Sequence, residues 1–103
     1  MSALVYDGWY FIEFINSAPV SQLKVVLAII TPQQIKLISE IAANIQANNL
    51  SLHEEEAVSK TFIKYIAKKN NTLAQKKRRI SSKQVQLTRM IKGVYPLLRL
   101  LIH

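Results

Sequence analysis

The sequence predicts an all-α fold: a compact bundle of four to five short helices with a basic C-terminal helix and a short apolar tail. Apolar residues recur at helical spacing in several segments, and signatures of helix N-termini precede these segments. Half of the residues are hydrophobic, which is enough for one core. We therefore interpret residues 1–103 as one helical domain in four parts. They are an aromatic N-terminal segment (1–19), a helical core (20–69), a basic helical region (70–93) and an apolar tail (94–103).

The N-terminal segment concentrates aromatic side chains within residues 4–15. They are Tyr6, Trp9, Tyr10, Phe11 and Phe14. Phe11, Phe14 and Ile15 fit one helical face, and we expect the rings to fill the core of a small domain. The alternative is a docking segment that inserts its rings into a partner, since aromatic residues often anchor interfaces. Residues 16–19 then interrupt the chain.

Two helices are expected in the next part of the chain. In the first, residues 20–30, the apolar positions have helical spacing, although β-branched content leaves a buried strand as an alternative. These positions are Leu23, Val26, Leu27 and Ile30. The second begins at Thr31, which can cap the helix while Pro32 takes its first position and Gln34 completes a capping box. Its apolar stripe is Ile35, Ile38, Ile41, Ala42 and Ile45, and residues 48–49 are expected to end it.

A second capping box at Ser51–Glu54 predicts a further helix that ends near Lys68. It would bury Val58, Phe62, Tyr65 and Ile66 and turn Lys60, Lys64 and Lys68 outward at a spacing of four. Glu54, Glu55 and Glu56 complement the positive end of such a helix. These carboxylates and His53 lack the spacing of metal ligands on one face, and we predict no metal site.

We expect a turn at residues 68–72, followed by a basic helix that Thr72 or Asn71 can cap. Leu73 and Ile80 would point inward, and Lys76, Lys77, Arg78 and Arg79 would surround the rest of the helix. A further capping box at residues 81–84 favours a break there. The alternative is one continuous helix, because Leu73, Ile80, Leu87 and Val94 recur every seven residues. Gly93 is the expected stop of the apolar pattern formed by Val85, Leu87, Met90, Ile91 and Val94.

The charge is distributed very unevenly along the chain. Residues 1–59 hold two Lys and all six acidic residues, a formal charge of −4, whereas residues 60–103 hold twelve Lys and Arg and no acidic residue, +12. Such asymmetry favours a polyanionic partner, with nucleic acid first and an anionic membrane surface second. A solvated basic helix without a ligand is the alternative. Adjacent cations repel each other unless a counter-charge is present, which favours the polyanion.

We predict that this region contacts DNA phosphates, because cations that wrap a helix suit the backbone better than base edges. The predicted nucleic-acid-binding residues are Lys68, Lys69, Lys76, Lys77, Arg78, Arg79, Lys83, Arg89 and Lys92. A helix-turn-helix made of residues 51–69 and 72–80 is an alternative that no specific spacing supports. The 76–79 run also matches a short nuclear import signal.

The apolar tail could pack on the body, self-associate, contact a capsid or lie on a membrane surface. Its apolar residues are Leu97, Leu98, Leu100, Leu101 and Ile102. The longest uninterrupted apolar run, residues 25–30, is far below the roughly 20 residues of a membrane-spanning helix. We therefore expect no segment to cross a membrane unaided.

The inventory of reactive residues argues against an enzyme. The chain has no Cys, two isolated His and two Gly, and its carboxylates cluster at a helix start. No nucleophile, metal cluster or phosphate-cradling loop is predicted, and we expect no cofactor.

Several segments together resemble one family. They are the upstream segments 14–19 and 23–30, Leu37–Ile45, Asn49–Leu52, the lysine-rich helix with the 76–80 run, and the apolar C-terminus. The chain is similar over residues 11–92 to the small basic protein encoded by Polinton (Maverick) elements and adintoviruses. It departs from that pattern in carrying Ala47–Asn49 in place of a glycine turn, in lacking a Gly-Gly after the basic run, and in its short tail.

This resemblance implies a minor virion or DNA-associated protein of a double-stranded DNA virus-like element. The implied role is similar to that of the small basic core proteins of adenoviruses, in the host nucleus or the virion interior. A minor capsid or scaffold protein that uses the apolar tail and the aromatic N-terminus is the alternative function.

Overall fold

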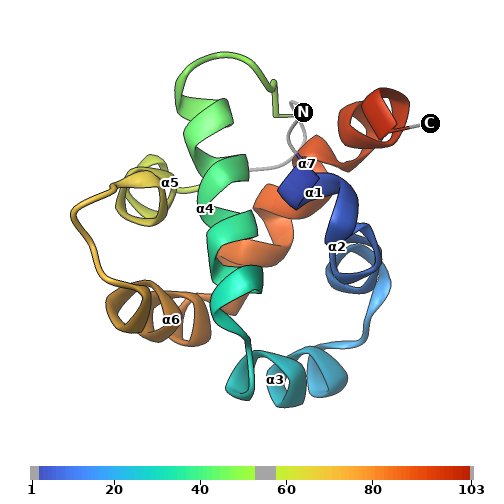
Figure 1. Ribbon diagram of the computed structural model, residues 1–103. Helices are drawn as coiled ribbons and strands as arrows, with labels where there is room; N and C mark the ends of the chain where they lie inside the picture. Colours follow the sequence, from blue (N-terminus) through green and yellow to red (C-terminus); the bar gives the residue numbers. More distant parts are fainter. Residues whose placement is uncertain (1–2, 53–57, 103) are drawn as a thin grey trace.

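A central helix, α4, is covered on both sides by the other helices (Figure 1). The computed structural model describes residues 3–52 and 58–102. Their helices are α1 (Ala3–Asp7), α2 (Trp9–Ser17), α3 (Val20–Ala28), α4 (Pro32–Gln46), α5 (Lys60–Ala67), α6 (Leu73–Ser82) and α7 (Gln84–Ile102). In Figure 1, α5 and α6 lie on one side of α4 and α1 and α2 on the other, while α3 lies below one end and α7 crosses behind. This arrangement gives α4 neighbours along most of its length.

The predicted all-α class is confirmed, and the predicted number of four to five helices is too low. The described residues form seven helices, because two predicted segments are each divided by a short break. Gly8 separates α1 from α2, and a β-carbon at this position would collide with Leu37 of α4. Lys83 separates α6 from α7 with φ −125° and ψ 47°, so the continuous-helix alternative is wrong. The globule has a radius of gyration of 12.3 Å, close to the roughly 13 Å expected at this length.

Local signals for helix ends are accurate at three of the expected positions. Thr31 and Thr72 each form the complete capping box, in which the threonine Oγ1 accepts a hydrogen bond from the backbone N–H three residues later, at 3.1 Å in both cases. In return, the backbone N–H of each threonine donates to the side-chain Oε1 of Gln34 or Gln75, at 3.0 and 2.8 Å. Asn48, just after α4, has φ 61°, the left-handed conformation that asparagine tolerates.

The start of α5 differs from the prediction. The helix begins at Lys60, and Ser59 rather than Ser51 is its N-cap, accepting a hydrogen bond from the Phe62 N–H at 3.2 Å. The backbone N–H of Ser59 in turn donates a hydrogen bond to Gln86 Oε1 of α7 at 2.7 Å. This bond connects the start of α5 to α7. His53 and residues 54–56, which the sequence analysis considered for a helix start and for a metal site, lie outside the described residues.

The core is one continuous cluster to which all seven helices contribute, and α4 supplies its centre. The stripe predicted for α4 is buried as expected except for Ile45, which is half-buried. The spacing correctly places Leu23 and Leu27 of α3 inside, together with Ile30 just beyond its end, whereas Val26 is half-buried. The larger fully buried residues contributed by the other helices are Ile12, Ile15, Leu27, Ile66, Ile80, Leu87, Met90, Ile91 and Leu98.

The C-terminal residues do not form a separate tail. Gly93 does not end the helix: it is buried inside α7, which continues through Pro96 to Ile102. Val94 and Leu98 are fully buried, so Leu98 belongs to the core and is not available to a partner. Burial of this apolar face outweighs the hydrogen bond that Pro96 removes from the helix. The side chain of Ile102 lies outside the described set.

The aromatic N-terminal segment is divided between core and surface. Trp9 and Phe11 are buried, and the Trp9 ring stacks on Tyr95 of α7 at a centroid distance of 5.3 Å. Tyr6 and Tyr10 are instead 66% and 86% exposed. The expectation that the rings fill the core therefore holds for only some of them.

Among the described helices, none alone combines the length and the apolar composition needed to span a membrane. Of the described helices, only the pair α3 and α4, taken together, has the required length and composition, and these two helices are bent by 115° relative to each other.

We expect Leu98→Ala to lower the free energy of unfolding by about 2–4 kcal/mol, because it leaves a cavity in the core. Leu100→Ala is the matched control: this leucine is 77% exposed, and its loss should change stability by no more than about 0.5 kcal/mol. Urea denaturation followed by circular dichroism measures both. Equal effects of the two substitutions would contradict the placement of α7.

Candidate nucleic-acid interface

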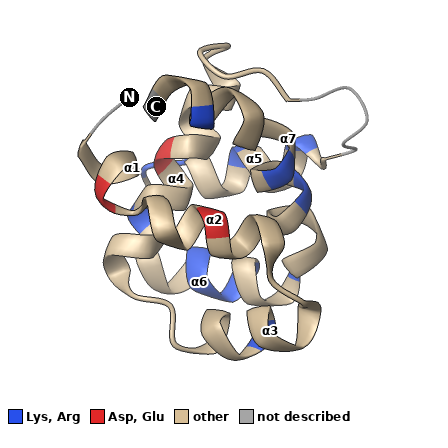
Figure 2. Cartoon of the chain, turned by 90° about the vertical axis from the view of Figure 1, so that its right-hand side faces the viewer, with Lys and Arg blue, Asp and Glu red and all other residues tan. Residues whose placement is uncertain are grey.

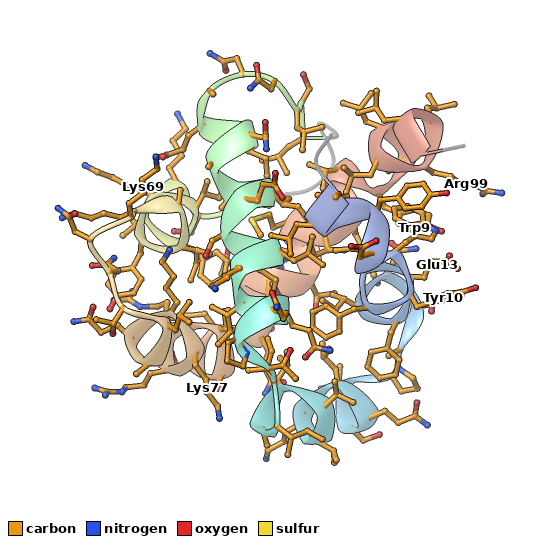
Figure 3. The ribbon with its side chains drawn as sticks, viewed as in Figure 1. Trp9, Tyr10, Glu13, Lys69, Lys77 and Arg99 are labelled. Carbon is orange, nitrogen blue, oxygen red and sulfur yellow. The ribbon has the colours of Figure 1, made fainter. Side chains whose placement is uncertain are left out.

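Six cationic residues lie on α5, on α6 and in the turn between them. We call this set the basic face; its members are Lys60, Lys64, Lys68, Lys69, Lys77 and Arg78. All are exposed except Lys77, which is half-buried. In Figure 3 the labelled Lys69 and Lys77 point away from the body on the side of α5 and α6, while Glu13 and Tyr10 lie on the opposite side.

The amphipathic pattern of α5 creates half of this face. Phe62, Ile63 and Ile66 are buried, and α5 packs more extensively on α4 than on any other helix. Because residues four apart share one side of a helix, Lys60 and Lys64 must then face solvent. Both were expected to point outward, yet the predicted set of nucleic-acid-binding residues omitted them. Their spacing of four residues from Lys68 indicated that the three lysines share one side of the helix.

The turn between α5 and α6 is held by side chains from both ends. Asn71 Nδ2 donates a hydrogen bond to the Tyr65 carbonyl at 2.9 Å, and the Thr72 capping box fixes the first turn of α6. The guanidinium carbon of Arg79 lies 4.1 Å from the centre of the Tyr65 ring, a cation–π contact between the two helices. These contacts connect α5 to α6, the two helices that carry the basic face.

Lys76 does not point outward as predicted. Its side chain is only 6% exposed, and its Nζ donates a hydrogen bond to Ser39 Oγ of α4 at 3.1 Å. Position 76 lies between Leu73 and Ile80 at helical spacing, so it falls on the inner side of α6. The sequence contains this spacing, but the prediction treated the four consecutive cations as one exposed run. Burial lowers the pKa of the Lys76 ammonium from its ordinary value of 10.5.

The remaining predicted cations lie in four places. Lys68, Lys69, Lys77 and Arg78 belong to the basic face, whereas Arg79 lies half-buried over Tyr65. Lys83 is exposed at the break before α7. Arg89 and Lys92 are exposed on α7, where they line a groove against α3. The nine predicted residues therefore do not form one surface.

The acidic residues that the structure describes lie on other helices. α5, α6 and α7 contain no Asp or Glu, and the described carboxylates are Asp7 of α1, Glu13 of α2 and Glu40 of α4. Figure 2 shows the acidic positions of α1 and α2 on the side turned toward the viewer, which is the right-hand side of Figure 1. The basic face therefore has a positive potential that no carboxylate of its own helices offsets.

Comparison of the chain with protein-family models, with curated proteins and with solved structures finds no match. Within residues 3–52 and 58–102, no group of three or more His, Asp or Glu side chains is arranged to hold a metal ion.

Lys76→Met should change stability at neutral pH by no more than about 1 kcal/mol, because the lost hydrogen bond and the avoided burial of charge offset each other. The lowered pKa means that the unfolded chain binds this proton more tightly than the folded chain. The free energy of unfolding should thus rise with pH toward 10.5 in the native chain, and this contribution should be absent from the variant.

Urea denaturation over this alkaline interval measures the difference. Ser39→Ala is the companion variant: it removes the acceptor of the buried ammonium and should cost about 1–2 kcal/mol in the native background but less beside Lys76→Met. Additive effects of the two substitutions would show that Lys76 does not contact Ser39, and an unchanged pH slope would show that its ammonium is not buried.

Proposed function

We propose that this chain is a non-enzymatic DNA-binding protein that contacts the phosphates of duplex DNA through its basic face, largely without sequence preference. One observation carries the proposal: six cations lie on two helices and a fixed turn that contain no carboxylate. Each phosphate that such a surface neutralises releases condensed counterions, and this release is the main source of sequence-independent affinity.

The form of the surface favours phosphate contact over base readout. Its cations are spread over two helices, whereas reading base edges needs a few side chains on one edge of a helix in the major groove. The turn between α5 and α6 has five residues, Lys68–Thr72, longer than the three or four of a helix-turn-helix unit. We therefore prefer binding along the backbone to insertion of α6 into a groove.

The resemblance to the small basic protein of Polinton elements and adintoviruses extends this proposal to a biological setting. A virion- or transposon-associated protein that binds or condenses DNA would act in the host nucleus or the virion interior. Condensation requires neutralisation of backbone charge rather than recognition of sequence, in agreement with the basic face.

Affinity for duplex DNA should fall with salt at a log–log slope of about −5 if six phosphates are contacted. The triple variant Lys64/Lys68/Arg78→Ala should reduce the magnitude of this slope by about 3. The matched control Lys24/Lys36/Arg99→Ala removes the same charge from exposed positions on α3, α4 and α7 and should leave the slope nearly unchanged. Fluorescence anisotropy between about 50 and 200 mM salt provides the measurement. Equal losses in both variants would mean that net charge, not the basic face, determines binding.

A second candidate function is that of a minor capsid or scaffold protein. Tyr6, Tyr10, Leu100 and Leu101 favour it, because all four are more than half exposed and each is a large hydrophobic residue. Attachment of the same exposed residues to a membrane surface is a weaker form of this proposal.

If this second function applies, the chain should self-associate at high concentration, and Tyr10→Ser/Leu100→Ser should shift it toward the monomer. Both residues are exposed, so the substitutions should leave the fold intact. Sedimentation equilibrium distinguishes the two states, and a native chain that stays monomeric throughout would reject the scaffold function.

A further inference from the structure

Three exposed lysines outside the basic face surround the start of α7. Lys83 lies at the break between α6 and α7, Lys92 is on α7, and Lys24 is on α3. We call these three residues the second cationic surface. Arg89 of α7 lines the same groove as Lys92, but it makes a contact within the protein and is left out of this set.

Two adjoining depressions bring these lysines together. The groove between α3 and α7 has a volume of about 380 Å³, and Lys92 lines it. A depression at the break between α6 and α7 has a volume of about 580 Å³, and Lys24 and Lys83 line it. The two depressions share the lining residues Val20, Gln84 and Val85. They therefore form one continuous hollow that all three lysines border.

The other polar residues of this hollow suit contact with phosphate groups. They carry hydroxyl or amide side chains and are Ser81, Ser82, Gln84, Gln86 and Thr88. Among the described residues, no Asp or Glu lines either depression, and α3, α6 and α7 contain none. Lys, Ser, Thr and Gln are among the side chains that contact phosphate oxygens in protein–DNA complexes. The hollow therefore fits a ligand that carries phosphates.

The length of the hollow favours a chain of phosphates over a single one. Lys83 and Lys92 are nine positions apart in the sequence, which corresponds to roughly 13 Å along a helix. Successive phosphates of one DNA strand advance by about 3.4 Å along the duplex axis, so several of them fit this distance. A free phosphate or a lipid headgroup would occupy only one end.

The second cationic surface and the basic face lie at different places on the globule. Figure 1 shows α3 below the start of α4, whereas α5 lies beside the later half of that helix. The two surfaces share no residue. A duplex that lies along α5 and its turn would therefore leave the α3 side of the hollow open to a second duplex.

We infer that the second cationic surface binds the phosphates of a second DNA segment, so that one chain bridges two duplexes. Bridging rests on the DNA binding proposed above and adds another contact surface to it. The second contact gains from the effective concentration that the first contact creates. A chain that holds two segments in this way compacts DNA without recognising its sequence.

Capture of a second duplex tests this bridging. A biotinylated duplex is bound to streptavidin beads, the protein is added, and the retention of a fluorescent duplex of the same length is measured. The native chain should retain the second duplex at about 50 mM salt. In an NMR titration with a short duplex, backbone amide resonances of α5 and α6 should shift at lower DNA concentration than those of α3 and the start of α7.

A pair of matched variants locates the second contact. Lys24/Lys92→Ala should reduce retention of the second duplex at least about tenfold and leave the affinity for one duplex nearly native. Lys36/Arg99→Ala removes the same charge from exposed positions outside both surfaces and should retain the second duplex as the native chain does. Because all four residues are exposed, their replacement should preserve the fold.

A third variant separates bridging by one chain from bridging by associated chains. Tyr10→Ser/Leu100→Ser, which would weaken self-association, should retain the second duplex normally. A loss of retention in this variant would assign bridging to self-association and overturn the inference.

Other outcomes would also overturn it. They are failure to retain a second duplex by a chain that binds the first, and equal losses in Lys24/Lys92→Ala and Lys36/Arg99→Ala. A fall in the single-duplex salt slope of Lys24/Lys92→Ala as large as that of Lys64/Lys68/Arg78→Ala would place both surfaces on one duplex. Resonance shifts of α3 with inorganic triphosphate but not with DNA would assign the hollow to a small ligand. A chain that binds no duplex at all would reject the proposed function itself.

Discussion

Burial of the apolar stripe of α4 is the constraint on which the rest of the structure depends. Ile35, Ile38, Ile41 and Ala42 are enclosed by helices that come from both ends of the chain. Each of those helices must turn an apolar side toward α4, and this requirement determines which of their polar residues reach solvent. The positions of the charges therefore follow from the packing of the core.

The basic region shows this dependence most clearly. Four consecutive cations occupy residues 76–79, yet only Lys77 and Arg78 become part of the basic face. Lys76 turns inward because it shares the inner side of α6 with Leu73 and Ile80, and Ser39 of α4 accepts its hydrogen bond. Arg79 lies over Tyr65, where it connects α6 to α5. A dense run of charge thus supplies structural contacts as well as a surface.

The fold also distributes the exposed cations over several places. The basic face lies on α5, on α6 and in the turn between them, whereas Arg89 and Lys92 are exposed on α7. The contact with one duplex that we propose would therefore use α5 and α6 rather than every cation in the second half of the chain.

The sequence by itself determined the helical class, the Thr31 capping box and the end of α4. It offered Thr72 or Asn71 as the cap of α6 and favoured a break after α6 over one continuous helix, and the structure has Thr72 and the break. These features depend on neighbouring residues, because a cap or a helical stripe is formed within a few positions of the chain. The tertiary structure decided the burial of Lys76 and Leu98, the stacking of Trp9 on Tyr95, and the distribution of the predicted cations over four places. These depend on which helices pack together, and a helix receives its buried side from neighbours that are distant along the chain.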